Sequence, residues 1–167
     1  IFRGGMPRLY MEQEMSTNLY FQGYIDTYIS RDVKLLTQVG NESSFRKFIV
    51  SVASKTGEQL NYTTLANDAG ISVPTAINWL SILTTSGLVY LLEPFMSSSL
   101  KRLTHIPKII FMDTGLACYL SGFSSAKELQ MSSNSGHFLE SFIISEIVKS
   151  YNAKGIRPNI SYYRDKE

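Results

Sequence analysis

The sequence predicts an α+β fold: N-terminal helices, then a winged helix-turn-helix, then a region that mixes strand and helix. Three patterns carry this prediction. Apolar residues recur at helical spacing in the first third of the chain. Residues 60–95 then follow the order helix, glycine, capped helix, glycine, strand, which is typical of a helix-turn-helix with the start of a wing. A short apolar strand and a long amphipathic helix follow between residues 108 and 151.

The N-terminal third is predicted to be helical. Pro7 favours a helix over residues 8–15, because its fixed φ suits the first helical position. A second helix is expected over residues 19–39, which are followed by a Gly-Asn pair. A third helix is expected to stop at Gly57. The apolar face of this third helix consists of Phe45, Phe48, Ile49, Val52 and Ala53.

The helix-turn-helix is the most readable part of the chain. Its first helix is predicted over Thr63–Ala69 and is closed by Gly70. Ser72 is a good N-cap for the second helix, and Pro74 falls in its first turn. This second helix is expected to end near Ser86.

The wing is predicted from the strand that follows. Residues 88–92 are apolar and read as its first strand. Three serines at 97–99 mark the expected tip, and the return strand is expected near residues 100–103.

The last third is predicted to alternate strand and helix. A strand over 108–112 leads to a short helix over 116–120, and the Ser- and Gly-rich residues 122–135 are predicted to be a loop. The amphipathic helix over 137–151 carries its apolar side on Phe138, Phe142, Ile143, Ile147 and Val148. Residues 160–164 read as a strand that opens a hairpin without a returning partner, so we expect the chain to be a piece of a longer protein.

Composition excludes several classes of protein. The 167 residues are 44% hydrophobic and 18% charged with net charge +2, which are near-average values for a globular domain. The lone Cys118 cannot form an internal disulfide, so a reducing compartment, the cytoplasm, is expected. No apolar run approaches the roughly 20 residues of a membrane span.

The chain also lacks the motifs of a self-contained enzyme. It has no Gly-x-x-x-x-Gly-Lys-Ser/Thr loop to hold a nucleoside triphosphate. His105 and His137 have no cysteine or acid at ligand spacing, which argues against zinc. Cys118 lies among apolar residues and is predicted to be an inert core residue. No catalytic residue is therefore assigned.

A helix-turn-helix suggests DNA, but the charges weaken that interpretation. The second helix, residues 72–86, contains no charged residue, and no basic residue lies between Lys55 and Lys101. DNA readers need cations near phosphate and polar side chains at the bases. A structural or protein-binding role is therefore favoured. DNA stays open as the alternative, with Thr75 and Asn78 at the bases and Lys101 and Arg102 on phosphate; Trp79, Leu80, Ile82 and Leu83 are predicted to be core.

One segment resembles a protease site used to remove purification tags. Residues 18–23 read Asn-Leu-Tyr-Phe-Gln-Gly. Thr17 stands where the usual site has Glu, and the aromatic pair runs into the predicted helix, so we interpret the segment as native.

Several phrases of the chain together resemble the C-terminal DUF4143 region of bacterial and archaeal AAA-type ATPases. They are Gly4-Gly5-Met6-Pro7, residues 24–33, the winged helix at 60–95, residues 107–116, residues 136–143 and Tyr162-Tyr163-Arg164. The resemblance implies an upstream ATPase module as partner, with ATP and Mg²⁺ bound by that parent protein and no cofactor in this piece. Residues 1–42 would be a helical lid remnant, 43–105 the winged helix and 106–167 the DUF4143 region.

The resemblance also implies two sets of site residues. Gly5, Met6 and Pro7 would lie on the adenine side of the parent's nucleotide pocket, unless they are simply a helix-starting turn. The last region would be an incomplete restriction-endonuclease-like unit, in which Glu140 is a vestigial metal ligand whose partner acids are missing. The function expected is a non-catalytic accessory region that couples nucleotide state to an unknown protein partner. DNA binding or a remnant of a metal-dependent nuclease are the alternatives.

Overall fold

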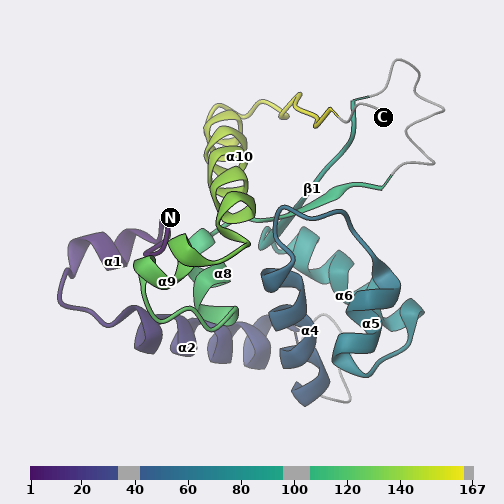
Figure 1. Cartoon of the computed structure of the whole chain (residues 1–167), viewed down its shortest axis with the longest axis horizontal. Helices are drawn as coiled ribbons and strands as arrows, with labels where there is room; N and C mark the ends of the chain where they lie inside the picture. The colour runs from purple at the N-terminus through teal and green to yellow at the C-terminus, as the bar shows by residue number, and fades with distance from the viewer. Residues whose placement is uncertain (34–41, 96–105, 164–167) are drawn as a thin grey trace.

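The computed structural model describes residues 1–33, 42–95 and 106–163. Helices dominate it, and two antiparallel strands form the sheet of the described residues, which agrees with the α+β prediction. In Figure 1, α2 lies along the base of the molecule, α10 rises opposite it, and α4, α5 and α6 gather on one side. The elements in chain order are α1 (Pro7–Met11), α2 (Thr17–Thr27), η1 (Tyr28–Val33), α4 (Glu42–Ser54), α5 (Tyr62–Ala69), α6 (Val73–Thr85), β1 (Val89–Leu92), β2 (Lys108–Phe111), α8 (Thr114–Leu120), α9 (Ala126–Met131) and α10 (Ser135–Ala153).

The predicted N-terminal helices exist with different ends. α1 stops at Met11, four residues before the predicted end. The second predicted helix is α2 continued by the π-helix η1, whose wider turn a 3.6-residue pattern does not reveal. The predicted residues 34–39 lie outside the described residues.

The segment that resembles a protease site is an integral part of α2. Its Phe21 side chain is 1% exposed. The Phe21 ring lies 6.0 Å from the ring of Tyr119 on α8. This burial fits the interpretation of residues 18–23 as native sequence, because a core aromatic at this position stabilises the fold.

The core between α4 and α6 is aromatic. The ring of Trp79 packs edge-on against Phe45 at 5.1 Å and against Phe48 at 5.6 Å between centroids. These rings are buried, as are the remaining residues predicted for the core on these two helices. The predicted apolar faces of both helices are therefore confirmed.

The α5–α6 unit forms where local signals place it. The Asn61 side chain caps α5 by accepting a hydrogen bond from the Thr64 amide at 3.0 Å. α5 ends at Gly70, which adopts φ +66°, a conformation that glycine takes without steric cost. Ser72 then caps α6 by accepting from the Thr75 amide at 3.2 Å.

The strand that pairs with β1 is β2. Register runs from Val89 opposite Phe111 to Leu92 opposite Lys108. The sequence placed β2 after the wing as a separate strand, and the predicted return strand at 100–103, with the wing tip at 97–99, lies outside the described residues. The sheet therefore joins residues on both sides of the predicted domain boundary at 105/106.

The chain after α8 differs from prediction in two ways. Residues 126–131 of the predicted loop form α9, because Ser125 caps the Glu128 amide while the Glu128 carboxylate accepts from the Ser124 amide at 2.7 Å. The predicted apolar side of α10 is only partly buried: Phe138 and Val148 are buried as predicted, whereas Ile143 and Ile147 are 49% and 39% exposed.

The small serines of α10 explain which face is buried. Ser141 and Ser145 face the core between the buried Phe138 and Val148. The Ser141 hydroxyl lies 2.8 Å from the hydroxyl of Thr56, which follows α4, so each hydroxyl has a hydrogen-bond partner. α10 and the end of α4 therefore approach closely at this point. Close packing over a small polar residue outweighs the hydrophobicity of the isoleucines.

The predicted strand at 160–164 is reduced to one bridge in the described residues. Tyr162 pairs in parallel with Pro94, just beyond the end of β1. In the described ranges, no helix is both long and apolar enough to cross a bilayer. The winged helix and the nuclease-like unit stay predictions at this level of description.

Candidate functional site

The outward face of α6 is exposed to solvent. Val73 and Ile77 are 37% and 47% exposed, and Pro74, Asn78 and Ser81 are exposed beside them. None of these side chains is charged. The surface is therefore mixed apolar and neutral polar.

The residues expected at DNA are only partly described. Asn78 is exposed, as a contact residue must be. Thr75 is committed to the cap, because its hydroxyl lies 2.7 Å from the Ser72 hydroxyl. Lys101 and Arg102 lie outside the described residues.

Arg46 on α4 and Lys55, the residue that follows α4, are both held in ion pairs. The Lys55 ammonium lies 3.0 Å from the Asp68 carboxylate on α5, and the Arg46 guanidinium lies 2.8 Å from the carboxylate of Asp26 on α2. The Ser51 hydroxyl donates to Asp68 at 2.6 Å. This hydrogen bond, followed by the hydrogen bond from Lys55, lowers the pKa of Asp68 below its ordinary value.

The lowered pKa predicts a pH-dependent stability. A carboxylate whose folded-state pKa is depressed stabilises the fold above its unfolded pKa, and this contribution is lost progressively as pH falls from about 4 through the folded-state pKa. We expect Asp68→Asn to cost about 1 kcal/mol in free energy of unfolding at pH 7 and less at pH 3. Urea unfolding at both pH values measures the gap, and Glu14→Gln, at an exposed carboxylate, is the control. A gap of constant size would contradict the assignment.

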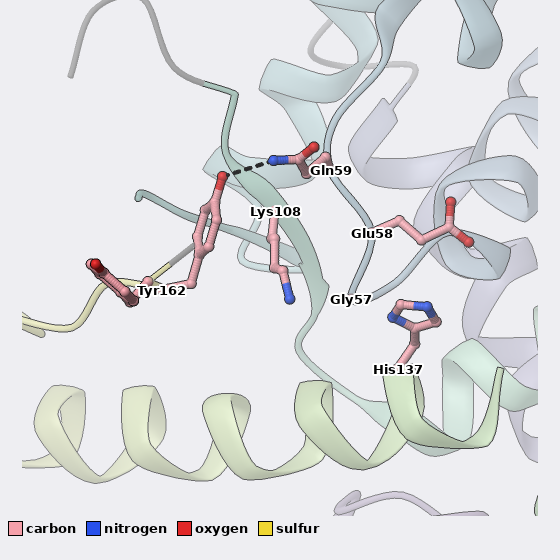
Figure 2. A pocket seen from close by; sticks show the side chains of 7 residues that line it. Gly57, Glu58, Gln59, Lys108, His137 and Tyr162 are labelled. Carbon is pink, nitrogen blue, oxygen red and sulfur yellow. Dashed lines mark hydrogen bonds between the residues drawn. The ribbon is translucent and has the colours of Figure 1, made fainter. Parts of the chain in front are cut away.

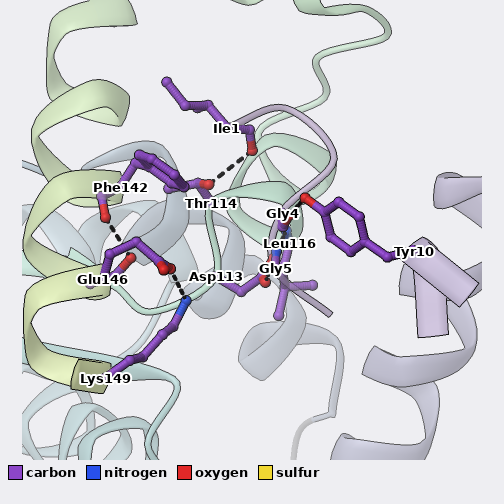
Figure 3. A network of polar contacts seen from close by, with 11 residues as sticks. Ile1, Gly4, Gly5, Tyr10, Asp113, Thr114, Leu116, Phe142, Glu146 and Lys149 are labelled. Carbon is purple, nitrogen blue, oxygen red and sulfur yellow. Dashed lines mark hydrogen bonds and ion pairs between the residues drawn. The ribbon is translucent and has the colours of Figure 1, made fainter. Parts of the chain in front are cut away.

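The turn expected on the adenine side of a nucleotide pocket packs against α8. The Gly5 amide donates to one oxygen of the buried Asp113 carboxylate at 2.8 Å, and the other oxygen accepts from the Leu116 amide at 2.8 Å (Figure 3). Pro7 is the first residue of α1, so the turn starts a helix. Met6 is half-buried and packs against the core. A nucleotide contact by Gly5, Met6 and Pro7 stays a prediction.

Glycines make this close approach possible. A Cβ on Gly4, whose φ is +75°, would lie 2.3 Å from an Asp113 oxygen. A Cβ on Gly115 would lie 2.5 Å from backbone atoms of Arg3 and Gly4. The Thr114 hydroxyl adds a hydrogen bond to the Ile1 carbonyl at 2.8 Å (Figure 3). The N-terminal turn is thus bound to the start of α8 through Asp113 and its neighbours.

Removing the Asp113 carboxylate is expected to release this turn. Asp113→Ala deletes both the cap of α8 and the acceptor for Gly5, and we expect a loss of about 2 kcal/mol in free energy of unfolding. Asp113→Asn keeps one acceptor oxygen and is expected to lose about half as much. Hydrogen exchange at residues 1–6 would rise more in the alanine variant. Equal exchange in the two variants would show that the carboxylate does not hold the turn.

A pocket of about 370 Å³ opens at the seam between the 57–59 turn, β2, α10 and the C-terminal segment. We call it the seam pocket. Figure 2 shows Lys108 between Tyr162 on one side and Glu58 and His137 on the other. The lining residues are Gly57, Glu58, Gln59, Lys108, His137, Tyr162 and Tyr163.

The Lys108 ammonium at the seam pocket contacts both a carboxylate and an aromatic ring. It lies 2.6 Å and 2.9 Å from the two carboxylate oxygens of Glu140, and 5.5 Å from the centroid of the Tyr162 ring. Glu140, expected as a vestigial metal ligand, is therefore an ion-pair partner in this structure. Among the described residues, no group of three or more His, Cys, Asp or Glu side chains is placed to hold a metal.

Sequence reasoning found few of the seam residues. The sequence suggests only zinc as a role for His137, and it places Lys108 and Tyr162 in strands and in phrases of the resemblance without giving either a role in a site. The spacing of Gln59, Lys108 and Tyr162 along the chain gives no signal, because only the tertiary fold brings them together.

Cys118, predicted to be inert, is buried, and burial raises the pKa of its thiol to about 12.

The comparisons with known proteins overturn the expected resemblance. No curated protein and no solved structure matches the chain. The family model that matches is not the DUF4143 region of AAA-type ATPases, so that assignment was wrong. An upstream ATPase module and its ATP and Mg²⁺ rested on it alone. The matching model covers residues 1–127, from the N-terminal turn through α8, and the chain belongs to the family described as Domain of unknown function (DUF8612).

Proposed function

We propose that this chain is a non-catalytic binding module that contacts a partner protein through the exposed face of α6. In this proposal α4, α5 and α6 with β1 and β2 form a winged helix, and α6 is its second helix-turn-helix element. The observation that carries it is the chemistry of that face: exposed Val73 and Ile77 beside neutral polar side chains.

The composition of this face fits a protein better than DNA. Exposed aliphatic side chains lose water favourably against an apolar partner surface but gain nothing from phosphate. The nearby cations Arg46 and Lys55 are already paired with carboxylates. A duplex contact would draw on Lys101 and Arg102, with the exposed Lys47 of α4 as a further cation.

Site-specific photo-crosslinking tests the proposal. A photoreactive residue that replaces Ile77 is expected to form one discrete covalent adduct between this chain and a partner protein. The matched control is Val50 on α4, an aliphatic residue of comparable exposure, which is expected to give none. Excess wild-type chain should remove the adduct, and excess Ile77→Asp should not.

Fluorescence anisotropy with a labelled duplex tests the alternative. Affinity tighter than about 1 µM that falls steeply with salt would favour DNA, since salt dependence counts phosphate contacts. That result, or equal crosslinking at positions 77 and 50, would refute the proposed function.

The cytoplasm remains the compartment we expect for this module, because its single cysteine cannot form an internal disulfide.

A further inference from the structure

A groove of about 470 Å³ lies between α1, the connection that follows it and α2, at one end of the molecule (Figure 1). We call it the α2 groove. Leu19, Gly23 and Thr27 line it from one face of α2, because they follow each other at intervals of four residues. This face extends over about 12 Å, so the α2 groove is elongated. The other lining residues are Arg8, Met15, Tyr20 and Tyr24.

The lining of the α2 groove is largely apolar. Met15, Tyr20 and Tyr24 are half-buried and pack against the core, which holds their side chains in place. The ring of Tyr20 lies edge-on to the ring of the buried Phe21, with 5.4 Å between the centroids. Leu19 is 71% exposed. A concave, mostly apolar surface with few polar groups is typical of a site for a small molecule.

Gly23 is the least expected residue of this surface. It lies in the middle of α2, where glycine lowers stability relative to alanine. Its φ is not positive, and a Cβ at this position would meet nothing within 4 Å. Neither the backbone conformation nor packing within the described residues therefore requires a glycine. A larger side chain here would occupy part of the α2 groove, which the glycine keeps open.

Arg8 supplies a positive charge to the α2 groove. Its Nε donates to the Glu12 carboxylate at 3.1 Å, in a pair whose side chains are 63% and 52% exposed. Such an exposed pair contributes little to stability. Within the described part of the chain, the four N–H groups on its Nη atoms have no acceptor, and a guanidinium matches both oxygens of a carboxylate. None of the residues that line the groove is acidic.

We propose that the α2 groove binds a linear amphipathic monocarboxylate of the fatty-acid type, with its alkyl chain over Gly23 and its carboxylate at Arg8. The elongated shape of the groove suits an alkyl chain better than a compact ring. One cation beside an apolar surface matches a single negative charge at the end of such a chain. This site is separate from the exposed face of α6, and neither proposal depends on the other.

Decanoate is the probe, and equilibrium dialysis against the full chain measures its binding directly. We expect a Kd between about 10 µM and 1 mM, as for a small ligand in an open apolar site. Arg8→Gln should weaken decanoate about tenfold and leave the binding of decanol, which has the same chain without the charge, unchanged. Arg157→Gln, at an exposed arginine beyond α10, is the control and should bind decanoate as wild type does.

A side chain at position 23 tests the place of the alkyl chain. Gly23→Leu should weaken decanoate and decanol at least about tenfold, because the leucine fills the space over which the chain lies. Gly136→Leu on α10 is the matched control, since a Cβ there also meets nothing within 4 Å, and it should leave binding unchanged. Gly23→Ala keeps the test valid if Gly23→Leu does not fold. It is expected to raise Tm by about 2–4 °C and to weaken decanoate about threefold, the effect of one displaced methylene.

Four results would overturn the proposal. The first is no binding of decanoate to wild type at 5 mM ligand, a concentration well above the expected Kd of about 1 mM or less. The second is equal binding to wild type and to folded Gly23→Leu, which would indicate adsorption to exposed apolar side chains elsewhere, such as Met11. The third is equal binding of decanoate to wild type and Arg8→Gln. The fourth is a lower Tm for Gly23→Ala, because the fold itself would then require the glycine.

Discussion

Phe45→Ala is expected to lower the free energy of unfolding by about 3–5 kcal/mol, which is a large fraction of the stability of a domain of this size. The Phe45 ring is fully buried on α4 and lies edge-on to Trp79 of α6 at 5.1 Å. Its loss leaves a cavity between the two helices, and it removes an aromatic pair. Urea unfolding followed by Trp79 fluorescence measures both stability and the local environment of the ring.

The control for this prediction lies on the same helix. Val50 is exposed, so Val50→Ala is expected to change stability by less than about 0.5 kcal/mol. The contrast removes any effect of helix propensity common to both sites. A loss below about 1 kcal/mol for Phe45→Ala would show that the α4–α6 contact does not stabilise the fold.

The elements that sequence predicted well are those determined by neighbouring residues. Ser72 starts α6 and Gly70 ends α5 through contacts within a few residues. The identities of these two residues are therefore enough to predict where the helices begin and end. α9 obeys the same rule, with Ser125 and Glu128 as its capping pair, but the surrounding serines and glycines obscured it.

What sequence could not predict depends on distant contacts. The buried face of α10 follows from the meeting of Ser141 with Thr56, which are 85 positions apart. The bond between Gly5 and Asp113 spans 108 positions. Both of its partners stood out as motifs, yet their order along the chain did not show that they touch.

The same contact explains why the resemblance to an ATPase region misled. The Gly4-Gly5-Met6-Pro7 phrase and residues 111–116 of the 107–116 phrase pack against each other in this structure. Phrases that serve packing report how a chain folds. They carry little information about an activity, which resides in a site.

Gly57→Ala is expected to destabilise the fold by about 2–5 kcal/mol, because it combines two separate penalties. The φ of +82° at this turn costs a residue with a Cβ about 1–2 kcal/mol. The added Cβ would also lie 2.8 Å from the His137 Cβ and 2.9 Å from the His137 backbone, an overlap that typically costs about 1–3 kcal/mol more. α10 must then move away from the seam pocket.

Gly70→Ala separates the two penalties. Gly70 has φ +66°, and a Cβ there would meet nothing within 4 Å, so only the backbone cost of about 1–2 kcal/mol applies. The difference between the two variants in urea unfolding therefore measures how closely the 57–59 turn packs on α10. Hydrogen exchange in the first turn of α10 should rise in Gly57→Ala and stay unchanged in Gly70→Ala. Equal destabilisation by Gly57→Ala and Gly70→Ala would mean that α10 shifts away from residue 57 with no loss of stability. α10 would then not form a rigid side of the seam pocket.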